Sequence, residues 1–111
     1  MKAKTRQIGA VSVVDITGQI TIGAGDVQMR DAVMELLEGD QKQILLNLSG
    51  VSYMDSAGIG ELVACFKRAK ERGGVVKLVN PTGKVYDLLQ LTKLEDIFEV
   101  FKEEKEALVS F

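Results

Sequence analysis

The residues with the clearest chemical potential are an aspartate and a serine, Asp55-Ser56, placed where an apolar segment gives way to a helical pattern. Either side chain can cap a helix by accepting a hydrogen bond from its first turn. The serine hydroxyl can also accept a phosphoryl group. A phosphate at that point would lie against free backbone N–H groups at the positive end of the helix dipole. Capping and phosphorylation are compatible, and the capping role is much the commoner one for an arbitrary Asp-Ser pair.

The helix that follows carries small residues on the side predicted to face solvent. Its predicted core face, on a period of 3.6 residues, consists of Ile59, Leu62, Val63, Phe66 and Ala69. Its predicted exposed face consists of Ala57, Gly60, Glu61, Ala64, Arg68 and Glu71. Two glycines in one helical turn cost about 1 kcal/mol each relative to alanine. An exposed face that begins so small suggests room for a large partner, such as a kinase, over the serine.

Other kinds of catalytic and metal chemistry lack their usual residues. The chain has no histidine and a single cysteine, Cys65. A Ser-His-Asp or Cys-His arrangement cannot be built from it, nor can a thiolate-rich zinc site. Gly23-Ala24-Gly25 lacks the third glycine of a dinucleotide-binding turn. We therefore predict no catalytic residue, metal or cofactor, and we expect Cys65 to be a packing residue.

The elements that must position Ser56 alternate between strands and helices. Predicted strands cover residues 4–17, interrupted at Gly9, and residues 44–48, 75–79 and 98–101. Predicted helices begin at Asp26 as N-cap and end at Gly39-Asp40, run from about 56 to 72, begin near Thr82, and cover 103–109. Residues 49–56 are predicted to be a loop after the central strand.

This alternation predicts an α/β fold. We expect one domain over residues 1–111, with a small, mostly parallel sheet of four or five strands, an antiparallel hairpin at its N-terminal edge and about four helices. Function in such sheets gathers at the carboxyl ends of the strands. The segment 49–56 lies at that position.

The segment Met54-Asp55-Ser56-Ala57-Gly58-Ile59-Gly60, preceded by Ile44-Leu45-Leu46-Asn47-Leu48, closely resembles the hallmark of the bacterial STAS proteins that act as anti-sigma-factor antagonists. The resemblance extends over nearly the whole chain. It implies a STAS-type fold and a partner-switching protein that is a kinase substrate and not an enzyme. In that family an anti-sigma-factor serine kinase phosphorylates the serine that matches Ser56, and a PP2C-type phosphatase removes the phosphate. The unmodified form captures the kinase and frees a sigma factor.

The resemblance also implies a partner-binding surface. Besides Asp55 and Ser56, we expect it to include Ala57, Gly58, Gly60, Glu61, Ala64 and Arg68, and from the loop after the second strand Gln19 and Thr21. That loop is expected to lie near Ser56. Many family members carry Gly-Glu-Leu-Asp there, whereas this chain has Gly18-Gln19-Ile20-Thr21, without an acid. The identity of the kinase therefore stays open.

Two alternatives belong to different classes. The chain could be a structural STAS subunit of a stressosome-like or lipid-transport assembly, without a phosphorylation switch. It could also be a small enzyme or a receiver domain phosphorylated on Asp55. A receiver domain needs an acidic pair after its first strand, and here Asp15 is alone and inside a strand.

Composition limits the partners and the compartment. Fourteen basic and sixteen acidic residues give a net charge of −2, so a nucleic-acid partner is not expected. No apolar run approaches the ~20 residues of a spanning helix, and the basic start leads into no signal-peptide segment. We predict a soluble cytoplasmic protein that does not bind membranes and is a monomer or weak dimer when free.

Overall fold

A five-stranded sheet forms the centre of the computed structural model, which describes residues 1–111. In chain order the strands are β1 (Lys2–Ile8), β2 (Val11–Ile20), β3 (Gln43–Met54), β4 (Val75–Val79) and β5 (Val100–Phe101). They lie in the sheet in the same order. β1 and β2 form an antiparallel hairpin, and every later pairing is parallel. The predicted mixed sheet with an N-terminal hairpin is confirmed.

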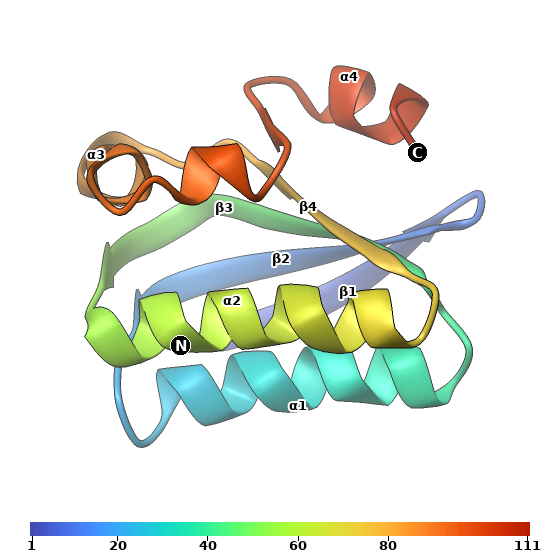
Figure 1. Cartoon of the computed structure of the whole chain (residues 1–111), viewed down its shortest axis with the longest axis horizontal. Coiled ribbons are helices and arrows are strands. Elements are labelled where there is room, and N and C mark those ends of the chain that lie inside the picture. The colour runs from blue at the N-terminus through green and yellow to red at the C-terminus, as the bar shows by residue number, and fades with distance from the viewer.

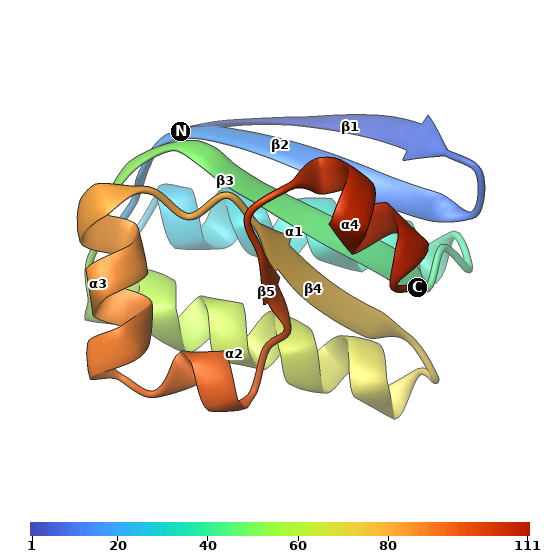
Figure 2. The same cartoon turned by 90° about the horizontal axis from the view of Figure 1, so that it is seen from above.

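The helices divide unequally between the two faces of the sheet. They are α1 (Gly25–Glu38), α2 (Ser56–Glu71), α3 (Gly83–Leu91), the single 3₁₀ turn η1 (Leu94–Asp96) and α4 (Glu104–Val109). α1 and α2 lie side by side along one face and begin at the same end of the molecule (Figure 1). α4 lies over the other face, and α3 lies at the end where α2 begins (Figures 1 and 2). No helix combines the length and the apolar character needed to cross a bilayer.

Each face of the sheet has its own apolar core. Under α1 and α2 a cluster of twenty buried residues fills the larger core, and α2 contributes Leu62, Cys65 and Ala69 to it. Under α4 a cluster of five residues forms the smaller core: Val11, Val13, Leu45, Val79 and Ala107. β2 and β3 supply residues to both clusters, which is why neighbouring residues in Val13-Val14 and in Ile44-Leu45-Leu46 are all buried.

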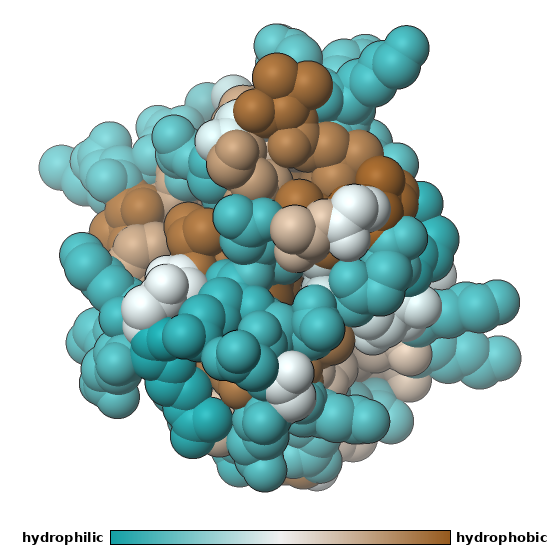
Figure 3. Space-filling view, turned by 90° about the vertical axis from the view of Figure 1, so that its right-hand side faces the viewer, coloured by the Kyte–Doolittle hydropathy of each residue, from teal (hydrophilic) through white to brown (hydrophobic).

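α4 is anchored to the sheet by charged side chains as well as by apolar contacts. The Arg6 guanidinium lies 2.6 Å from Oδ2 of Asp15 and 2.6 Å from Oε1 of Glu104, so it joins the hairpin to α4. The buried Lys77 ammonium donates to the Ser110 carbonyl oxygen at 2.8 Å. At the end of the molecule where α4 lies, some apolar side chains still reach the surface (Figure 3). Val109 in α4 is the most exposed of the large ones, at 83%.

The central strand is longer than its sequence predicts. We expected a strand over 44–48 and a loop over 49–56, but β3 continues to Met54. Asn47 pairs with Asp15 and Gly50 with Thr17, so β3 has one residue more than β2 in this stretch. A second such bulge follows between Val51 and Tyr53. The buried residues therefore recur every third position instead of every second: Leu48, Val51 and Met54.

The start of α1 differs from prediction, whereas its predicted end at Gly39-Asp40 is confirmed. Asp26 was expected as the N-cap, but Ala24 occupies that position and Asp26 lies in the first turn. The Asp26 carboxylate accepts hydrogen bonds from the Gly23 and Val27 amides, at 2.9 and 2.8 Å, so it orders the turn that leads into the helix. At the other end Asp40, and not Gly39, has the left-handed backbone, with φ of 63°.

Candidate functional site

Asp55 is the residue that caps α2. It has the extended backbone of an N-cap, and its Oδ1 accepts a hydrogen bond from the Gly58 amide at 2.9 Å. Its Oδ2 accepts a second bond, at 3.0 Å, from the Ile22 amide in the loop between β2 and α1. The backbone donors of Ile22 and Gly58 lower the pKa of the Asp55 carboxyl. One carboxylate thus ties the start of α2 to the neighbouring loop.

Ser56 is the first residue of α2, and its side chain is exposed. Because Asp55 caps the helix, capping does not occupy the Ser56 hydroxyl. The residue stands at the carboxyl end of the central strand, where α1 and α2 both begin (Figure 1). The two helix starts direct their unpaired N–H groups toward this end. The hydroxyl is accessible to a visiting enzyme, and a phosphate attached there would meet a favourable field.

The two glycines of the first turn have different roles. A Cβ built on Gly58 would overlap the Ile20 carbonyl oxygen, so no side chain can be accommodated there as the backbone stands. Gly58 is buried, so it is a packing residue and not the exposed contact that we predicted. A Cβ on Gly60 would meet nothing within 4 Å, and Gly60 is exposed. Of the two glycines, only Gly60 contributes to the exposed surface of small residues beside Ser56.

Glu61 is a second correction to the predicted surface. It was expected on the exposed face of α2, but it is 6% exposed. Its carboxylate accepts hydrogen bonds from Arg30 Nε at 2.7 Å and from Arg68 Nη1 at 2.5 Å. Burial raises the pKa of the Glu61 carboxyl, but the bonds from Arg68 and Arg30 outweigh burial and lower it overall. Glu61 joins α1 to α2 and is not available to a partner.

The remaining predicted surface residues lie at or near the surface. Ala57, Ala64 and Arg68 on α2 are half-buried. Gln19 is exposed and pairs in register with Tyr53, three residues before Ser56. Thr21 is half-buried and directly precedes Ile22, whose amide donates to Asp55. The expectation that the β2–α1 loop lies near Ser56 is confirmed.

Sequence reasoning missed the apolar residues around the site. Ile22 is 76% exposed, Tyr53 47% and Val27 36%. The sequence signal that could have revealed Ile22 is its place inside the turn-rich segment 18–25, where no strand or helix period explains an apolar residue. The composition of that segment predicts a connector, and only its polar residues were expected as contacts.

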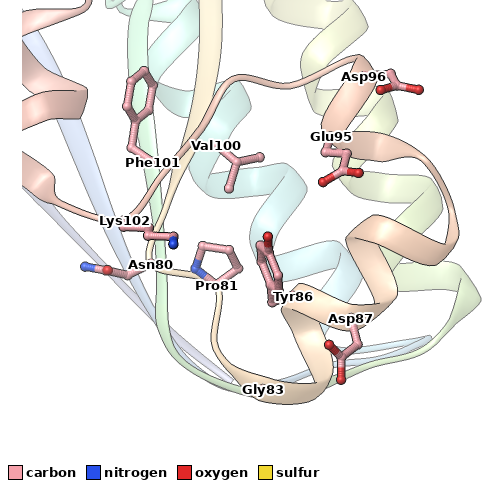
Figure 4. Close-up of a pocket in the computed structure, with 10 residues that line it drawn as sticks. All are labelled: Asn80, Pro81, Gly83, Tyr86, Asp87, Glu95, Asp96, Val100, Phe101 and Lys102. Atoms are coloured by element: carbon pink, nitrogen blue, oxygen red, sulfur yellow. The ribbon is translucent and has the colours of Figure 1, made fainter.

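A cavity of about 650 Å³ is lined by none of the predicted site residues (Figure 4). It opens between the carboxyl end of β4, α3, η1 and β5. Its lining mixes apolar and charged side chains: Pro81, Tyr86, Val100, Phe101, Asp87, Glu95, Asp96 and Lys102, with Asn80 and Gly83.

Thr82 is the N-cap of α3, so the predicted start of that helix is confirmed.

Cys65 lies in the larger core, where it is fully buried. Burial, reinforced by the neighbouring charge of Glu61, raises the pKa of the Cys65 thiol to about 12. A thiol with so high a pKa carries almost no nucleophilic thiolate at neutral pH. The prediction that Cys65 is a packing residue agrees with its position.

Comparison with known proteins identifies the family. The sequence model of the STAS domain family matches residues 2–107, which is nearly the whole chain. The chain belongs to the STAS domain family. A curated relative, the anti-sigma-B factor antagonist of Bacillus subtilis, is 36% identical over 87 residues, which cover 78% of each chain.

Two solved structures share the whole fold. The crystal structure of a Thermotoga maritima protein assigned as an anti-sigma factor antagonist superimposes with a TM-score of 0.89 at 26% identity, covering 97% of this chain and 92% of that one. The Bacillus cell fate determinant SpoIIAA, in its phosphorylated form, gives a TM-score of 0.74 at 20% identity, with 98% of each chain covered. At that identity the second likeness concerns the fold alone.

Proposed function

We propose that this STAS domain, residues 1–111, is an anti-sigma-factor antagonist whose binding is switched by phosphorylation of Ser56. In the unmodified state it captures an anti-sigma-factor serine kinase in the cytoplasm and so releases a sigma factor. The kinase phosphorylates Ser56 and is then released, and a PP2C-type phosphatase restores the binding form. The protein itself catalyses no reaction in this cycle.

The observation that carries the proposal is the division of roles between Asp55 and Ser56. Asp55 supplies the helix cap, and Ser56 presents a free, exposed hydroxyl one residue later. Phosphorylation therefore need not break the cap. The names of curated relatives, such as the anti-sigma-B factor antagonist of Bacillus subtilis, support the regulatory class.

The chemical step is phosphoryl transfer from ATP. Oγ of Ser56 attacks the γ-phosphorus, the new O–P bond forms as the bond to ADP breaks, and the hydroxyl proton passes to a base of the kinase. The phosphatase reverses the modification by hydrolysis, in which water cleaves the O–P bond and inorganic phosphate leaves. The serine hydroxyl is regenerated.

The phosphate changes binding through its charge. It adds nearly two negative charges at neutral pH, next to the ionised Asp55. A partner docked over Ala57, Gly60 and Ala64 would bury this dianion without a counter-ion. Such burial costs about 2–5 kcal/mol, which corresponds to a loss of affinity of roughly 30-fold to several thousandfold.

The test compares three chains against the cognate kinase. Wild type should be phosphorylated once, on Ser56, as located by mass spectrometry of peptides. Ser56→Ala should bind the kinase as wild type does but accept no phosphate, and Ser56→Asp should bind at least about 30-fold more weakly in titration calorimetry. If the kinase and ATP leave Ser56 unmodified, or if Ser56→Asp binds like wild type, the switch is wrong and a structural STAS subunit is the better description.

A further inference from the structure

We propose that Ile22 is the apolar anchor of the kinase-binding surface and that Asp55 transmits the state of Ser56 to it. The inference rests on the proposed function and adds two things to it. It names a contact residue outside the serine motif, and it gives phosphorylation a second way to weaken binding besides the buried charge.

Ile22 has the properties of an interface anchor. Only Ile22, Leu91 and Val109 among the large apolar residues are more than three-quarters exposed, and Ile22 alone of these belongs to the loop bonded to Asp55. The favourable free energy of burying the Ile22 side chain is realised only when another molecule covers it. Its position beside the switch residue indicates which molecule that is. The partner is then a kinase with an apolar pocket next to its serine-binding cleft.

The loop that carries Ile22 is held in place before any partner arrives. The Ile22 amide donates to Asp55 Oδ2 at 3.0 Å, and the Gly23 amide donates to Asp26 Oδ1 at 2.9 Å. The Asp26 amide in turn donates to the Thr21 carbonyl oxygen at 3.1 Å. These bonds order the loop in the free protein, so binding through Ile22 loses less conformational entropy than binding through a mobile loop.

Asp55 connects this loop to the phosphorylation site. Each of its two oxygens accepts one backbone bond, Oδ1 from Gly58 and Oδ2 from Ile22. A phosphate on the next residue, Ser56, repels the Asp55 carboxylate, while the cap bond from Gly58 lies within the same helix turn as both residues. The bond to Ile22 is the one that leaves the helix, so it is the bond we expect to break. Asp55 is thus a positioning residue for Ile22.

The first experiment needs no kinase. Phosphoserine is placed at position 56 during translation, and the Ile22 amide is followed by ¹⁵N NMR and hydrogen exchange, with phosphoserine at the exposed Ser49 as matched control. We expect exchange at Ile22 to become about tenfold faster with phosphoserine at position 56, as the loss of one charge-assisted bond implies, and to stay unchanged with phosphoserine at position 49. An exchange rate of the Ile22 amide that is the same with and without the phosphate on Ser56 would show that Asp55 does not transmit the state of Ser56 to Ile22.

A second variant separates the relay from a general loss of structure. The asparagine side chain introduced by Asp55→Asn still caps α2 through its amide oxygen but presents an NH₂ group in place of the second acceptor. We expect the Ile22 amide of this variant to exchange fast already, and phosphoserine at position 56 to add nothing further. Additive effects of the two changes would show that Asp55 does not transmit the signal.

The anchor itself is tested in the kinase complex. Ile22→Ala should weaken binding to the cognate kinase about 30-fold, the size of an interface hot spot. Val109→Ala should stay within about twofold, because Val109 belongs to α4, which lies away from the start of α2 (Figure 1). Equal affinities for Ile22→Ala and wild type would overturn the anchor while leaving the Ser56 switch intact. A wild-type chain that binds no such kinase would instead overturn the proposed function, and the anchor with it.

Discussion

At the scale of single residues, the site depends on how closely two backbones approach each other. Gly58 lies where α2 meets the end of β2, and the Ile20 carbonyl oxygen occupies the space of a side chain. Gly60, two residues later, faces open space. The same residue type is thus required at one position by packing and is free at the other, where we assign it to a binding surface.

A pair of alanine substitutions tests this difference. Gly58→Ala should destabilise the protein by about 2–4 kcal/mol, because Cβ cannot be accommodated without moving α2 or β2. Gly60→Ala should stabilise it by about 0.5–1 kcal/mol, because alanine is the better helix former. Urea unfolding followed by circular dichroism measures both. Similar effects of the two substitutions would contradict the close contact at Gly58.

At the scale of elements, the two long helices are joined by a charged cluster as well as by their apolar faces. Glu61 of α2 is buried between Arg30 of α1 and Arg68 of its own helix. A buried carboxylate is costly unless its partners compensate for the lost water, and here two guanidinium groups do so. The cluster fixes the alignment of α1 and α2, and with it the relation between the two helix starts at the site.

The sign of the resulting pH dependence follows from the lowered pKa of Glu61. A carboxyl whose pKa is lower in the folded state contributes stability above its unfolded pKa, and that stability is lost as the pH falls through the folded value. Glu61→Gln should therefore lower stability at neutral pH and flatten the decline in acid. The urea midpoint measured between neutral and acidic pH shows this. Glu71→Gln, an exposed change in the same helix, is the control and should leave the profile unaltered.

At the scale of the whole molecule, the sheet is covered thickly on one face and thinly on the other. The short helix α4 alone covers the smaller core, and it is held by Ala107, by the Arg6 contacts to Glu104 and by Lys77 beneath Ser110. A six-residue helix has little stability of its own. Its presence depends on these contacts with the sheet.

Two substitutions within α4 test this dependence. Ala107→Glu places a charge in the smaller core, where Ala107 is fully buried, and should cost about 3 kcal/mol or more, with loss of α4 protection in hydrogen exchange. Val109→Glu, two residues away and 83% exposed, should change stability by less than about 0.5 kcal/mol. Binding at Ser56, at the other end of the sheet, should survive both changes in whatever fraction remains folded. An Ala107→Glu chain as stable as wild type would show that α4 does not close this core.

The sequence by itself determined the order of elements, the mixed sheet and the position of Ser56 at a helix start. These follow from local properties: apolar period, β-branched runs, glycine ends and the motif from Met54 to Gly60. It also indicated that α2 has a small-residue surface. Each of these features involves residues close together in the chain, which is why pattern alone could reveal them.

Only the tertiary structure decided which side chains of the motif are available. Asp55, and not Ser56, is the cap of α2, and its second oxygen meets Ile22, which is 33 residues away in the chain. Glu61 turned inward because Arg30 approaches it from another helix, and Gly58 was buried by the end of β2. The bulges of β3 likewise follow from its pairing with β2. A helical period predicts the direction in which a side chain points, but not which residue of another segment lies opposite it. That neighbour is determined by contacts between segments that are distant in the chain.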